Sequence, residues 1–149
     1  MSANDSHFSV FWSRGSSLTN PPTGSALRVG KHAGEDPITI RADEIIGYLV
    51  IEGGEWLLGD RPYLAGLGSD SVWGVGDSPP NNYSFGGFST ASTAIVAQSG
   101  MDGGNGGWAV LYGQNPVTPS NLNLAIDEDQ LKDSERSHTT EQVSYAIFE

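Results

Sequence analysis

Short runs of alternating apolar and polar residues recur along the chain, and no long window shows the 3.6-residue apolar period of a helix. Such runs predict half-buried strands. The predicted strands cover residues 7–12, 44–52, 93–98, 107–113, 122–127 and 142–149. Residues 44–52 (EIIGYLVIE) are apolar on both faces, which predicts a central strand. Several short strands separated by turn residues indicate an all-β fold, an antiparallel β-sandwich.

The chain also contains an internal similarity. Residues 41–52 (RADEIIGYLVIE) align without gaps on residues 138–149 (HTTEQVSYAIFE), and a polar stretch with a histidine and acids precedes each. The alignment favours a single domain over residues 1–149, built from two related halves, 1–73 and 88–149, joined by the Pro/Gly/Asn-rich loop 74–87. The alternative is chance similarity, because strands draw on a narrow set of residues.

Composition narrows the range of functions. The formal net charge is −11, which argues against nucleic acid or an anionic membrane as partner and fits a neutral glycan or a cation better. The alternative, which we favour, is that the acidity only keeps the protein soluble in a salty medium. No apolar run reaches 18 residues, so no membrane insertion is expected. The absence of cysteine excludes disulfides and thiolate metal sites. No export signal is visible at the start of the sequence, so a secreted protein would be a piece of a longer precursor.

The stretch from residue 125 to 149 is strongly acidic. It holds seven carboxylates but only two full cations, Lys132 and Arg136. Four of its acids gather within a few residues at the end of a predicted strand and could bind Ca²⁺: Asp127, Asp129, Asp133 and Glu135. The alternative is a solvated hairpin held by local hydrogen bonds, with Arg136 pairing Asp129 or Glu135.

Histidine chemistry is open to two interpretations. His138, beside two threonines and Glu141, could be a ligand or base, or it could bridge loops at a strand entry. The same alternatives apply to His32 with Glu35 and Asp36. No P-loop, G-x-S-x-G or H-E-x-x-H motif occurs, so nucleotide binding and standard hydrolase triads are not predicted.

Aromatic residues supply the candidate ligand site. Trp56, Trp73 and Tyr83 lie in loop-like surroundings, where exposed rings could stack on sugar, whereas Trp12 and Trp108 fall on strand faces and are expected in the core. Tyr63, Asn82, Asp60 and Arg61 complete the candidate set, the last three as hydrogen-bonding partners of hydroxyls. The alternative for each ring is core packing or loop anchoring.

Residues 124–149 (LAIDEDQLKDSERSHTTEQVSYAIFE) resemble a repeat module of large secreted or surface proteins of bacteria. In that module a strand leads to an HTTE hairpin and then to a V-x-Y strand that ends in Glu. From residue 88 onward the chain also resembles H-type lectin domains. The first resemblance implies an extracellular or cell-surface location within a larger secreted protein. The second implies a six-stranded sandwich and galactose-type sugar binding between subunits of a trimer.

These observations favour a non-catalytic extracellular binding module, with a glycan or polysaccharide as ligand. The alternative is a structural repeat of an adhesin or extracellular fibre, which contacts neighbouring modules or other copies. A glycan-cleaving enzyme with two carboxylates is a third class, but no such pair is apparent in the sequence. A binding module predicts Trp56, Trp73 and Tyr83 exposed together. A structural repeat predicts them buried, with exposed apolar patches elsewhere.

Overall fold

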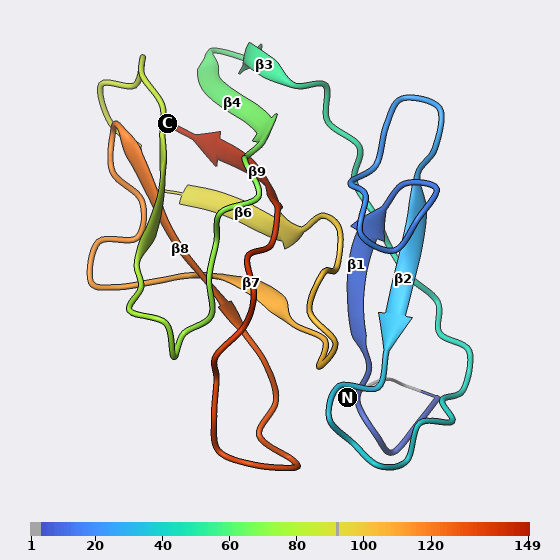
Figure 1. Cartoon of the computed structure of the whole chain (residues 1–149). Coiled ribbons are helices and arrows are strands. Elements are labelled where there is room, and N and C mark those ends of the chain that lie inside the picture. Colours follow the sequence, from blue (N-terminus) through green and yellow to red (C-terminus); the bar gives the residue numbers. More distant parts are fainter. Residues whose placement is uncertain (1–3, 92) are drawn as a thin grey trace.

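The computed structural model describes residues 4–91 and 93–149, and these residues form strands and no helix (Figure 1). The strands are β1 (Val10–Arg14), β2 (Arg28–His32), β3 (Gly54–Leu58), β4 (Arg61–Leu67), β5 (Asn81–Ser84), β6 (Thr93–Gln98), β7 (Trp108–Leu111), β8 (Asn121–Asp127) and β9 (Val143–Phe148). The predicted all-β class is confirmed. No membrane-spanning helix is found in the described part of the chain.

The strands form three antiparallel sheets. The largest has the order β3-β4-β9-β6, the second has the order β5-β8-β7, and β1 pairs with β2 alone. In Figure 1 the β1–β2 hairpin stands beside the two larger sheets. An isolated parallel bridge between Ser13 and Ser99 joins the hairpin to the chain just after β6.

The main core lies between the two larger sheets, as in a β-sandwich. Leu122, Leu124 and Ile126 alternate along β8 and are fully buried against Val143 and Ile147 of β9. Each such side chain contributes about 1.5–3 kcal/mol when it leaves water. The alternation that predicted these two strands therefore also identified their inner faces.

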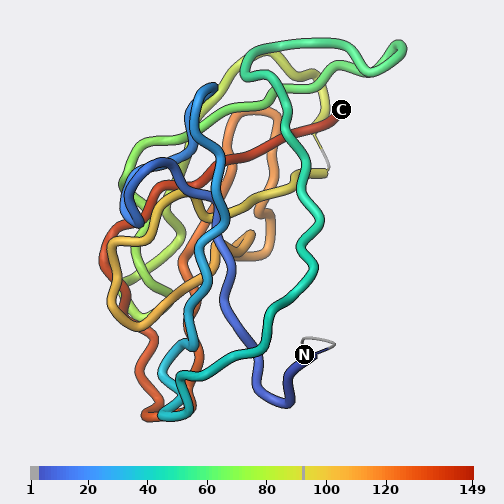
Figure 2. Tube along the Cα trace, turned by 90° about the vertical axis from the view of Figure 1, so that its right-hand side faces the viewer, coloured from blue at the N-terminus to red at the C-terminus, as the bar shows by residue number. Residues whose placement is uncertain are grey.

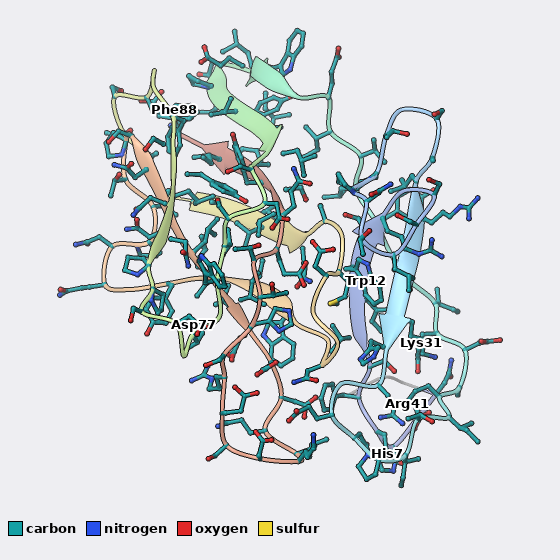
Figure 3. The ribbon with its side chains drawn as sticks, in the orientation of Figure 1. His7, Trp12, Lys31, Arg41, Asp77 and Phe88 are labelled. Carbon is teal, nitrogen blue, oxygen red and sulfur yellow. The ribbon has the colours of Figure 1, made fainter. Side chains whose placement is uncertain are left out.

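A smaller core fills the space beside the hairpin. Val10, Trp12 and Met101 are buried there, and Phe8 and Trp108 pack against them. Trp12, labelled on β1 in Figure 3, faces Gly30 of β2, where a Cβ would come within 2.1 Å of the indole ring. Both tryptophans that were expected in the core are thus at core positions.

Five of the six predicted strands are present, as β1, β6, β7, β8 and β9. Strands β2, β3 and β4 were not predicted, because glycine, proline and charged residues interrupt them. The predicted loop 74–87 contains β5, which lies at the edge of its sheet. An edge position tolerates the neighbouring prolines and glycines, because only one side of the strand needs hydrogen bonds.

The predicted central strand at residues 44–52 is wrong. The segment is irregular, and Ile45 and Leu49 are 96% and 80% exposed. Figure 2 shows the chain between β2 and β3 running alone along one side of the molecule. β9 lies between β4 and β6, whereas none of the described strands lies beside residues 44–52 to supply hydrogen-bond partners. The two related halves are therefore not confirmed.

The two similar stretches are preceded by the same succession of elements along the chain. Each follows an antiparallel hairpin and a polar loop: β1–β2 precedes residues 41–52, and β7–β8 precedes residues 138–149. Arg41, first in its stretch, pairs with Asp36 (Nη2 to Oδ2, 3.0 Å), which also meets His7 (Figure 3). His138, first in the other, pairs with Glu128 (Nδ1 to Oε2, 3.1 Å).

Candidate functional site

Three aromatic side chains form a row across the four-stranded sheet. Trp56 of β3 is directly opposite Tyr63 of β4, which is directly opposite Phe148 of β9. Directly opposed residues share a face, so all three lie on one side of the sheet. The next pair along these strands, Leu64 and Ile147, lies on the opposite face and packs in the main core. The aromatic row therefore lies on the outer face of the sheet.

The aromatic row is partly ordered by its own contacts. The rings of Tyr63 and Phe148 stack with centroids 5.9 Å apart and planes at 30°. Trp56, at the edge of the sheet, is 44% exposed. The β3–β4 hairpin holds Trp56 and Tyr63 in register through the two-residue turn Gly59-Asp60, in which Gly59 takes a positive φ of 68°.

A half-open pocket of about 220 Å³ lies between this hairpin and the loop that carries Phe88 (Figure 3). Its lining residues are Glu55, Trp56, Leu57, Pro62, Tyr63, Gly86, Gly87 and Phe88. The pocket and the row therefore share Trp56 and Tyr63. Asp60 in the hairpin turn and Arg61 at the start of β4 are exposed nearby, and Arg61 alternates onto the same face as Tyr63.

The structure brings together four of the predicted ligand-site residues, namely Trp56, Tyr63, Asp60 and Arg61, and leaves three elsewhere. Asn82 is on β5, and Trp73, 48% exposed, accepts a hydrogen bond from the Ile126 amide of β8 through its carbonyl. Asn82 thus belongs to the three-stranded sheet, and Trp73 lies in the segment that borders it. Phe148 was missed, although its outward position in the alternation of β9 could have revealed it.

The expectation of an exposed Tyr83 is wrong. Tyr83 is 7% exposed and belongs to the main core. Its hydroxyl donates to the Ser69 carbonyl (2.5 Å) and accepts from the Val143 amide (3.2 Å). Burial raises the pKa of Tyr83 to about 12. The ring fills the core while its polar end is satisfied, as buried tyrosines require.

Two of the four predicted metal ligands are engaged within the chain. Asp127 forms a two-point ion pair with Arg136, at 2.8 Å to Nε and 2.6 Å to Nη2. The hydrogen bonds that Arg136 donates to Asp127 raise the pKa of Arg136. The predicted partners of Arg136, Asp129 and Glu135, are therefore wrong. Asp129 is buried and accepts hydrogen bonds from the backbone of Glu35 (2.8 Å) and Leu131 (3.0 Å).

The other two predicted ligands meet a third acid. Carboxylate oxygens of Asp133, Glu135 and Glu35 lie within 4.8 Å of one another. Burial and the negative charges of Asp133 and Asp129 raise the pKa of Glu35. The sequence analysis grouped Glu35 with His32 and not with the predicted metal ligands. Nothing in the sequence shows that the loop after β2 contacts the loop after β8.

A buried histidine lies between two buried carboxylates. His138 Nδ1 is 3.1 Å from Glu128 Oε2, and Nε2 is 2.9 Å from Glu141 Oε1. Burial lowers the pKa of His138, but the hydrogen bonds to Glu141 and Glu128 outweigh that effect and raise it. Only the imidazolium can donate to both acids. Glu141 also accepts from the Asp102 and Gly103 amides, so this group joins both ends of the β8–β9 loop to the β6–β7 loop.

Comparison of the chain with protein-family models, curated proteins and solved structures finds no match. The aromatic row, the adjoining pocket and the acidic loops are therefore the basis on which a function can be proposed.

Proposed function

We propose that this protein is a non-catalytic binding module and that its aromatic row binds a glycan or polysaccharide. The observation that carries the proposal is the alignment of Trp56, Tyr63 and Phe148 across three adjacent strands on an outer sheet face. Sugar rings present apolar C–H faces that stack on aromatic rings, and nearby polar side chains bind the hydroxyls. Asp60 and Arg61 are placed for that second role.

Charge and pocket composition agree with this assignment. A net charge of −11 disfavours polyanions, so the proposed ligand is a neutral glycan. Among the residues that line the pocket, only Glu55 carries a carboxylate, whereas glycoside hydrolysis ordinarily uses two. Glycan binding also supports an extracellular or cell-surface location, within a larger secreted protein.

We expect Trp56→Ala to weaken glycan binding about tenfold or more, because the loss of one stacked ring removes about 1.5 kcal/mol. Glycan-array screening would identify a ligand, and titration calorimetry would measure its affinity for each variant. Trp73→Ala is the matched control, since Trp73 is exposed to a similar extent (48% against 44%) but lies beside the other sheet, hydrogen-bonded to β8. A wild-type protein that binds no glycan, or an equal loss in both variants, would contradict the proposal.

A second candidate function is self-association, as in a structural repeat of an adhesin or fibre. Residues 45–51 expose Ile45, Tyr48, Leu49 and Val50, and their backbone makes no hydrogen bond with the described chain. An apolar side chain presents on the order of 100 Å², so the exposed apolar residues of this segment and of β3 together present several hundred Å². A standard interface buries about 800 Å² per partner.

A second copy of the chain is the proposed occupant of this surface. Residues 45–51 resemble β9, a strand that is paired on both sides in this fold, and β3 leaves one edge of its sheet free. Antiparallel pairing of residues 45–51 with β3 of another copy, repeated by two-fold symmetry, would satisfy both sets of backbone groups.

Association is expected to depend on protein concentration and to strengthen with salt, because screening reduces repulsion between copies of charge −11. Light scattering after size-exclusion chromatography measures the mass. Leu49→Lys is expected to yield monomer. Leu131→Lys makes the same change at an exposed leucine in the loop after β8, outside the proposed interface, and is expected to leave association unchanged. A monomer at every concentration and salt level would exclude this function.

A further inference from the structure

The loop after β2 and the loop after β8 are fixed against each other at one end of the molecule (Figures 1 and 2). The Glu35 amide donates to Asp129 Oδ2 at 2.8 Å. Gly34 has a positive φ of 68°, and a Cβ there would come within 1.9 Å of the same oxygen. This close contact brings the side chain of Glu35 to the acids of residues 128–135.

Negative charge accumulates where the loops meet. Oxygens of Glu35, Asp133 and Glu135 lie within 4.8 Å of one another. Arg136 is engaged by Asp127, which leaves Lys132 as the cation whose charge acts on Glu35. Carboxylates at this spacing repel strongly unless they bind protons or a cation.

Buried oxygens without donors provide a second, independent observation. Glu128 is 3% exposed, and its Oε1 has no hydrogen-bond partner, although Oε2 meets His138. Oε2 of Glu35 is likewise shielded from solvent and without a partner. Burial raises the pKa of Glu128, and the adjacent Glu135 carboxylate raises it further, so Glu128 neighbours one member of the acidic group. Buried acceptors without donors are costly and rare in folded proteins.

We propose that Glu35, Asp133 and Glu135, with the unpartnered oxygen of Glu128 next to Glu135, bind a divalent cation of the Ca²⁺ type, which ties the loop after β2 to the loop after β8. Their ligand atoms are all carboxylate oxygens, the donors that hard cations prefer, and Ca²⁺ accepts irregular arrangements of six to eight oxygens. A zinc site is disfavoured, because both ring nitrogens of His138 already face carboxylates. Asp127 and Asp129 support the loops and are not ligands in this assignment.

Calcium is expected to raise the melting temperature of the wild-type chain by about 5 °C, because a ligand that binds only the folded state stabilises it. Calorimetric titration with CaCl₂ is expected to show one Ca²⁺ per chain. Glu135→Gln, at an exposed position, is expected to abolish the calcium-dependent increase and to raise the melting temperature of the metal-free chain slightly, because it relieves repulsion.

Glu52→Gln is the matched control, since it makes the same substitution at an exposed glutamate just before β3, outside the acidic group, and is expected to keep the full calcium response. NaCl of equal ionic strength separates specific binding from general screening. No increase with calcium, an increase that NaCl reproduces, or an unchanged increase in Glu135→Gln would each overturn the proposal.

Discussion

Glu141→Ala is expected to lower the free energy of unfolding by about 3–5 kcal/mol, the cost of removing one partner from a buried ion pair. Glu141 is fully buried and faces His138 Nε2 at 2.9 Å. It also accepts hydrogen bonds from the Asp102 amide (2.9 Å) and the Gly103 amide (2.8 Å). Alanine would leave the buried His138 ring nitrogen and the two part-buried amides without this acceptor and would open a cavity. Urea denaturation followed by tryptophan fluorescence measures the loss.

Two variants separate burial from charge in that experiment. Glu52→Ala makes the same substitution at an exposed glutamate and is expected to change stability by less than about 0.5 kcal/mol. Glu141→Gln keeps one oxygen acceptor for the amides but loses the charge facing His138, so an intermediate loss is expected. A loss for Glu141→Ala no larger than that for Glu52→Ala would show that the buried network contributes little to stability.

The fold was predictable where the alternation of apolar and polar residues within one strand identifies that strand. In β8 and β9 apolar residues alternate regularly with polar or small ones, and both strands lie where the alternation placed them. Residues 41–52 carry a similar pattern and form no strand. The difference is not local: β9 lies between β4 and β6, whereas residues 41–52 have no neighbouring strand. Strand formation depends on partners, which periodicity does not reveal.

The candidate site was predictable in part. Trp56 and Tyr63 were identified by residue type, although the hairpin that aligns them was interpreted as a loop. Its signal was the two-residue turn Gly59-Asp60 between the apolar runs 56–58 and 62–64. The acidic loops were also recognised, but Glu35 and the buried Glu128 were not assigned as ligands, because their positions depend on contacts between distant loops.

Tyr83 was wrongly predicted to be exposed, because the sequence does not show that Gly68 leaves room for its ring in the core. A Cβ at Gly68 would come within 1.9 Å of the Tyr83 ring, so the ring can enter the core only because residue 68 has no side chain. The backbone there cannot shift easily, since the Gly68 amide donates to the Val143 carbonyl (2.9 Å) and its carbonyl accepts from the Gln142 side chain (2.6 Å). Sequence alone does not link a glycine to a ring fifteen residues away.

Gly68→Ala is therefore expected to destabilise the protein by about 3 kcal/mol, at the upper end for an overpacked core, because neither the ring nor the backbone can yield cheaply. Chemical denaturation measures the change. Gly24→Ala is the matched control, because a Cβ there meets nothing within 4 Å. In a Tyr83→Leu background the cost of Gly68→Ala is expected to shrink, since the smaller side chain leaves room for the methyl group. An equal cost in both backgrounds would mean that contact with the ring is not why residue 68 must be glycine.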